Sequence, residues 1–113
     1  MSSFRIYKDN SEIIISSLQE NVLGGNEALE FTSQLHDHLQ KDVKIVIVDL
    51  SKVIMINSSG LGMLVSGLSS IKKHGASMVL TGVPEKVMSL LKMTHLDRVF
   101  QLSNSIEEAV RRI

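Results

Sequence analysis

Apolar and polar positions in the first third of the chain change from the two-residue repeat of strands to the longer repeat of a helix. Phe4–Lys8 alternates, and turn-forming residues separate it from the apolar run Ile13–Leu18, so this region predicts a β-hairpin. Asn21–Asn26 is predicted to be a loop. A helix should follow and end near Lys41, because apolar side chains recur at spacings of three and four at Ala28, Phe31, Leu35 and Leu39.

The middle of the chain contains its most apolar segment, Val43–Leu50. A run so rich in β-branched residues predicts a strand buried on both faces, at the centre of a sheet. A short extended stretch, Val53–Ile56, then leads into Asn57. The next helix should end near Gly75, its expected C-cap. Its predicted apolar stripe consists of Leu61, Leu64, Val65, Leu68 and Ile71.

The last third repeats the alternation of strands and helices. Met78–Thr81 is predicted to be a strand, and Pro84 should be the first residue of a helix with Val87, Leu90 and Leu91 inward. Val99–Leu102 is a further short strand. Ser105 and Glu108 have the spacing of a capping box and open a terminal helix. The inward side chains of that helix should be Ile106, Ala109, Val110 and Ile113.

The predicted order is β-β-α-β-α-β-α-β-α, which indicates an α/β fold. Strands that alternate with helices form a mainly parallel sheet through right-handed crossovers, and the first hairpin makes that sheet mixed. We therefore expect one domain over residues 1–113, with about four helices packed on the sheet. The length suits a single domain, and neither a linker nor a repeat interrupts the chain.

Composition excludes several classes of function. The chain has no Cys, and His36 and His38 would face different sides of a helix, so we expect no thiol chemistry, no metal site and no cofactor. The formal net charge is zero, with −4 in residues 1–50 and +4 in residues 51–113. Scattered basic residues and few aromatic residues argue against nucleic-acid binding. Because no apolar run approaches the ~20 residues of a membrane span and the N-terminus lacks a signal sequence, we expect a cytoplasmic protein.

The segment Asn57-Ser58-Ser59-Gly60-Leu61-Gly62 stands where a strand passes into a helix. Asn57 or Ser58 can cap that helix by accepting hydrogen bonds from free backbone N–H groups. Gly60 and Gly62 would keep the first turn slim enough for another chain or a phosphate to approach. A phosphate on Ser58 would lie near the positive end of the helix dipole. Ordinary capping without any function also explains these residue types.

Catalysis at this turn is not expected. It lacks the Gly-Lys-Ser/Thr of a phosphate-binding loop and the Gly-x-Ser-x-Gly of a nucleophile elbow, and no general base stands near Ser58 in the sequence. Met63, on the helix after the turn, either fills the core or contributes to an adaptable partner surface. A small-molecule or nucleotide site at the same turn remains an open alternative.

The stretch Ile47-Val48-Asp49-Leu50-Ser51-Lys52-Val53-Ile54-Met55-Ile56-Asn57-Ser58-Ser59-Gly60-Leu61-Gly62 resembles the signature of STAS domains, especially of bacterial anti-sigma factor antagonists. Gly75–Pro84 and Leu96–Phe100 resemble later elements of the same family. The resemblance extends over nearly the whole chain and is specific from about Val43 onward.

The resemblance implies a phospho-regulated switch that acts on transcription. In this family, the unphosphorylated antagonist binds a serine-kinase anti-sigma factor and so releases a sigma factor; the kinase then phosphorylates the antagonist, and a PP2C-type phosphatase resets it. Carried over, Ser58 is the phospho-acceptor. The partner-binding residues would be Asn57, Ser58, Ser59, Gly60, Leu61, Gly62 and Met63. Asp49 matches the acidic residue that ends the central strand and would orient the turn.

The chain departs from the family pattern at two places. Asn57 stands where the family usually has Asp, which keeps a capping acceptor but removes a negative charge beside Ser58. The loop Leu18–Gly25 lacks the usual acidic residue. An alternative is therefore a STAS domain that binds without phosphorylation, as a scaffold or as a subunit of a larger assembly such as a lipid-transport complex.

Overall fold

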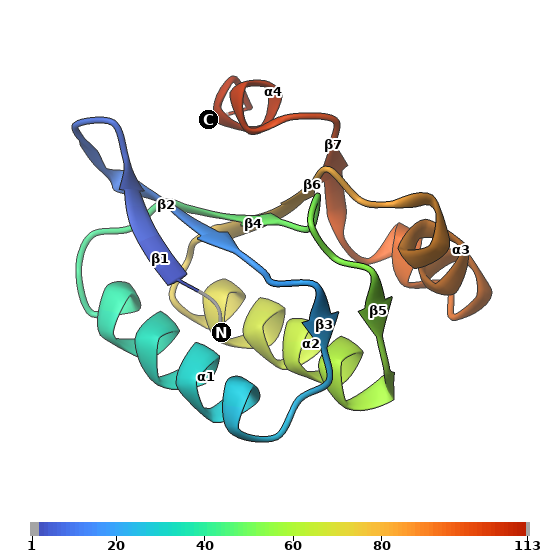
Figure 1. Cartoon of the computed structure of the whole chain (residues 1–113). Helices are drawn as coiled ribbons and strands as arrows, with labels where there is room; N and C mark the ends of the chain where they lie inside the picture. Colours follow the sequence, from blue (N-terminus) through green and yellow to red (C-terminus); the bar gives the residue numbers. More distant parts are fainter. Residues whose placement is uncertain (1–2, 113) are drawn as a thin grey trace.

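Strand β4 (Ile45–Asp49) lies at the centre of the sheet, as its dense β-branched sequence predicts. The computed structural model describes residues 3–112, in which a five-stranded sheet has the order β1-β2-β4-β6-β7 (Figure 1). β4 pairs in parallel with β2 and β6, and Ile47 stands between Ile15 and Val79. The other strands of this sheet are β1 (Ser3–Tyr7), β2 (Asn10–Ser17), β6 (Ser77–Thr81) and β7 (Gln101–Ser103).

The predicted hairpin and mixed sheet are confirmed. β1 runs antiparallel to β2 along one edge, and β6 pairs in parallel with β7 at the other. Each parallel connection carries a helix, as the alternating sequence requires. The helices are α1 (Asn26–Leu39), α2 (Ser58–Lys73), α3 (Glu85–Met93) and α4 (Ile106–Val110), with a 3-10 turn, η1 (Leu96–Arg98), before β7.

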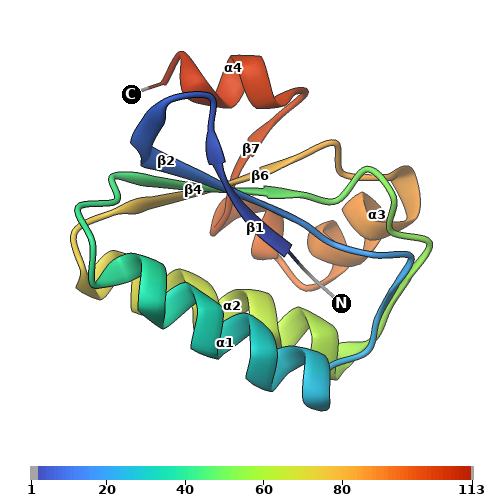
Figure 2. The ribbon, with the colours of Figure 1, turned by 60° about the vertical axis from the view of Figure 1, so that its left-hand side comes forward.

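The two faces of the sheet are covered unequally. α1 and α2 lie side by side on one face, and α4 crosses the other (Figure 2). Alternate side chains of β2 and β4 explain this arrangement: Ile14 and Val46 belong to the large core beneath α1, α2 and α3, whereas Ile15 and Ile47 belong to the smaller cluster beneath α4. Within residues 3–112, no helix is both long and apolar enough to cross a membrane.

The predicted helix boundaries need small corrections. Pro84 is the N-cap of α3 rather than its first residue. The predicted stripe of α2 is buried except at Val65, and Met63 is buried in addition. The C-cap of α2 is His74 rather than Gly75, and Gly75 follows it with φ +77°, the left-handed conformation that commonly ends a helix. Ile113, predicted to face inward, lies outside the described residues.

The predicted loop after β2 contains a strand that the pattern did not indicate. β3 (Asn21–Val22) pairs in parallel with β5 (Met55–Ile56), and the two form a separate two-stranded sheet. β5 leads directly into Asn57. The small sheet therefore joins the loop after β2 to the turn that begins α2.

Candidate functional site

The Asn57 turn and the loop after β2 form one surface because backbone hydrogen bonds join them. The Met55 N–H donates to the Glu20 carbonyl at 3.0 Å, and the Asn57 N–H donates to the Val22 carbonyl at 3.3 Å. These bonds continue the β3–β5 pairing up to the first residue of the turn. The position of the turn therefore depends on a loop that lies about 35 residues earlier in the chain.

Asn57 is the N-cap of α2, in agreement with the sequence. Its backbone is extended, with φ −107° and ψ −178°, and its Oδ1 accepts the Gly60 N–H at 2.8 Å. Ser58 and Ser59 occupy the first two helical positions and are exposed. Since the first turn of α2 has no acidic side chain, the positive end of the helix dipole there faces outward without a neighbouring carboxylate from that turn.

Gly60 and Gly62, which were predicted to play the same role, have different surroundings. Gly60 is buried, and a Cβ at this position would overlap the carbonyl oxygen of Val22. Its lack of a side chain therefore serves the close packing of α2 on β3, which corrects the idea that it leaves room for a partner. Gly62 is exposed, and no atom of residues 3–112 lies within 4 Å of the corresponding position on it.

Two other residues of the predicted partner surface face the interior. The side chains of Leu61 and Met63 are buried in the large core. This corrects their assignment as contact residues, and for Met63 the core-filling alternative is the one observed. The exposed part of the predicted surface consists of Asn57, Ser58, Ser59 and Gly62.

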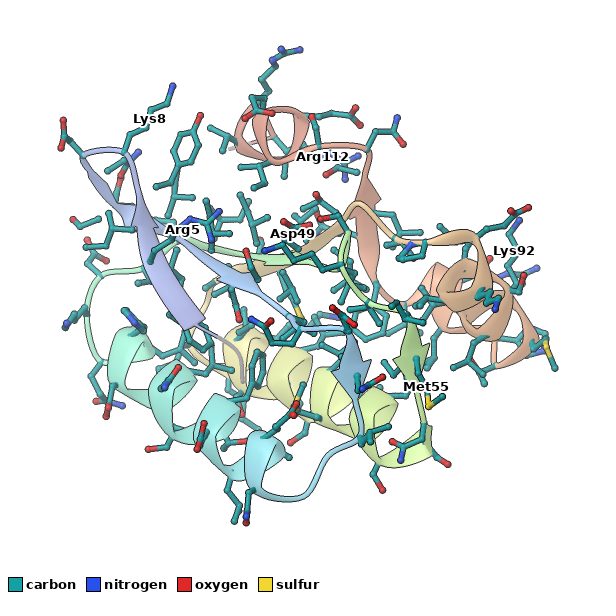
Figure 3. All side chains as sticks on the ribbon, in the orientation of Figure 1. Arg5, Lys8, Asp49, Met55, Lys92 and Arg112 are labelled. Carbon is teal, nitrogen blue, oxygen red and sulfur yellow. The ribbon has the colours of Figure 1, made fainter. Side chains whose placement is uncertain are left out.

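Asp49 does not orient the Asn57 turn as expected. Its Oδ1 accepts the Ser51 N–H at 3.0 Å and so supports the turn directly after β4. Figure 3 shows Asp49 at the end of β4, well away from the first turn of α2. Gly82 is its close neighbour, because a Cβ there would lie 3.2 Å from Asp49 Oδ1. Asp49 therefore belongs to the carboxyl edge of the five-stranded sheet.

The structure adds Leu23 and Gly24 to the surface, which sequence reasoning placed only in a loop. Gly24 has φ +81°, and a Cβ on it would approach the Ser59 Cβ to 2.7 Å. Leu23 is 44% exposed beside this contact. The pair Gly24-Gly25 was the available signal, since consecutive glycines with positive φ allow a backbone to pass close to another element.

An apolar groove lies beside the turn, between β5 and α3. It has a volume of about 470 Å³ and is lined by Ile54, Met55, Ile56, Lys86, Val87, Ser89, Leu90 and Met93. We call it the β5–α3 groove. Because β5 ends one residue before Asn57, the groove continues the surface that contains Ser58.

Comparisons with known proteins agree on one family. The family model described as STAS domain matches residues 6–109. A Thermotoga maritima protein provisionally named an anti-sigma factor antagonist is 34% identical over 77 residues, which is 68% of each chain. The anti-sigma-B factor antagonist of Listeria monocytogenes is 27% identical over 64 residues, 57% of this chain and 56% of that one. The crystal structure of a T. maritima protein given the same provisional name superposes with a TM-score of 0.82 at 28% identity, covering 99% of this chain and 93% of that one.

Proposed function

Because this chain belongs to the STAS domain family, we propose that it is an anti-sigma factor antagonist whose binding is controlled by phosphorylation of Ser58. The partner is a serine-kinase anti-sigma factor, and its capture releases a sigma factor. The observation that carries this proposal is the exposed Ser58 hydroxyl at the first position of α2, directly after the Asn57 cap. A kinase can reach this hydroxyl without unfolding any element.

The physical effect of phosphorylation follows from the surroundings of Ser58. A phosphate adds about −1.5 to −2 charges at pH 7, to a turn that otherwise presents only neutral side chains. The helix N-terminus favours that anion, so α2 persists while the surface changes its charge. A partner shaped to a neutral Ser-Ser surface then meets a desolvation cost and leaves. A PP2C-type phosphatase restores the neutral surface.

Phosphorylation with ATP and the serine-kinase anti-sigma factor encoded in the same genome tests the proposal. We expect one phosphate per chain, located at Ser58 by mass spectrometry of peptides. Ser58→Ala should abolish it, whereas Ser59→Ala, the matched control, should retain it. A phosphate found only at other positions would refute the assignment of Ser58.

A second candidate function is favoured by Asn57. The family usually has Asp before the acceptor serine, and a neutral amide removes a charge that a kinase could recognise. In this case the domain binds constitutively as a scaffold or subunit. A stable non-kinase partner on purification from the source cells, together with no Ser58 phosphopeptide, would support this alternative.

A further inference from the structure

Three large apolar side chains that line the β5–α3 groove are exposed. Ile54 is 62% exposed, Met55 is 56% exposed and Met93 is 78% exposed. Each is a large side chain at one rim of the same hollow, whose floor includes the buried Val87. Figure 3 shows the Met55 side chain outside the β5 ribbon, on the side where α3 lies. Large apolar side chains gathered around one hollow are a feature of interaction sites.

The groove is continuous with the surface that contains Ser58. Ile56 lines the groove and is followed immediately by the capping residue Asn57. β5 pairs with β3 only, so its other edge faces the groove without a neighbouring strand among residues 3–112. A protein that binds over the Ser58 turn can therefore contact the groove at the same time.

The charge of the groove indicates which charged group its occupant should have. Of the described residues that line it, Lys86 alone is charged and none is acidic. An apolar segment that brings a carboxylate would pair with this ammonium group, whereas a basic segment would be repelled. The two methionines can adapt to the shape of such a segment, because Met is unbranched and flexible.

We propose that the β5–α3 groove is a second contact for the partner that covers Ser58, and that it receives an apolar segment of that partner with a carboxylate facing Lys86. The identification of this partner as a kinase rests on the proposed function. The use of the groove as a contact does not depend on whether the partner is a kinase. It gives the exposed side chains of Ile54, Met55 and Met93 a shared role as contacts for one apolar segment.

Site-specific photo-crosslinking in cells of the source organism tests the shared contact. A benzophenone amino acid replaces Leu23, at the rim of the Ser58 surface, or Met93, in the groove; Ile6, half-exposed on β1, is the matched control position. We expect Leu23 and Met93 to capture the same protein, identified by mass spectrometry, and Ile6 not to capture it. The proposal is overturned if Met93 captures a second copy of this chain, lipid, a different protein or nothing.

Affinity measurements with the captured protein test the chemistry. By titration calorimetry, we expect Met93→Ser and Lys86→Glu each to weaken binding about five- to tenfold, as for other centrally buried contacts. Lys86→Glu should also reduce the salt dependence of association. Ile6→Ser and Lys73→Glu, the matched exposed controls, should change the dissociation constant less than twofold. Wild-type affinity of both groove variants would overturn the proposal.

The two proposals fail in different ways. If the same protein is captured at both positions but has no kinase activity toward Ser58, the proposed function fails and the groove contact stands. If Leu23 captures a serine kinase and Met93 does not, the groove proposal fails and the proposed function stands.

Discussion

Replacing Gly60 or Gly62 with Ala should change the stability of the protein in opposite directions. Both glycines lie in the first turns of α2, and an Ala in a helix is more favourable than a Gly by about 1 kcal/mol. Helix propensity alone therefore predicts that each substitution stabilises the fold. The structure predicts otherwise for Gly60, because a Cβ there would overlap the Val22 carbonyl oxygen.

The magnitudes follow from the two environments. At Gly62 no neighbour in the described part of the chain lies within 4 Å of the new methyl group, so the full propensity gain of about 0.5–1 kcal/mol remains. At Gly60 the backbone of β3 must shift, which costs about 1–3 kcal/mol as other overpacked sites do. The shift also weakens the bond from the Asn57 N–H to the Val22 carbonyl, worth about 1 kcal/mol. Gly60→Ala should therefore lower the free energy of unfolding by about 1–3 kcal/mol.

Urea denaturation followed by far-UV circular dichroism measures both variants against the wild type. At a chain length of 113 residues, each kcal/mol corresponds to about 4 °C in Tm, so thermal melts should separate the two variants clearly. Equal stabilisation by both substitutions would refute the argument, because it would mean that β3 does not constrain the start of α2.

Three further predictions concern other parts of the fold. Asn57→Ala should lower the free energy of unfolding by about 1 kcal/mol, because the cap is lost. Asn57→Asp keeps an acceptor and adds a charge that the helix dipole favours, so it should raise the free energy of unfolding by about 0.3–1 kcal/mol. Urea titrations compare the two variants with the wild type. Ser16→Ala should raise the free energy of unfolding by about 1 kcal/mol in the same assay, because the buried Ser16 Oγ has no hydrogen-bond partner among residues 3–112; a loss of stability would contradict this reasoning. Burial, and secondarily Lys41, lower the pKa of His38 from 6.5, so the folded state favours the neutral imidazole. The free energy of unfolding should therefore fall as the pH is lowered through 6.5. In His38→Gln, the free energy of unfolding should decline less between pH 7.5 and 5.5.

The features that sequence predicted well depend on neighbouring residues. The N-caps Asn57 and Ser105 each involve groups three positions apart. Ser105 Oγ accepts the Glu108 N–H at 3.1 Å, which is one half of the predicted capping box, while the Glu108 carboxylate lies 3.6 Å from the Arg112 guanidinium. The hairpin of β1 and β2 and the central position of β4 likewise follow from patterns within single segments.

The features that sequence missed depend on distant contacts. β3 has only two residues, too few for any periodicity, and its partner β5 lies more than 30 positions later. The buried side of α2 was predicted too narrow for a related reason. α2 packs on both the sheet and α1, where a Cβ on Gly67 would lie 3.1 Å from the Phe31 ring, so its buried arc is wider than a single stripe. Met63 therefore lies inside, and Gly60 serves packing.

The β3–β5 pair has a consequence for how the binding surface opens. Among residues 3–112 it shares no strand with the five-stranded sheet, and it is held by a few backbone hydrogen bonds and by the buried side chain of Val22. Amide protons at Met55 and Asn57 should therefore exchange with solvent through a local opening of low free energy, while those in β4 exchange only when the whole molecule unfolds. The surface around Ser58 is in this sense a separate cooperative unit. A partner that binds this surface makes it more rigid, and the core does not have to open or rearrange for binding.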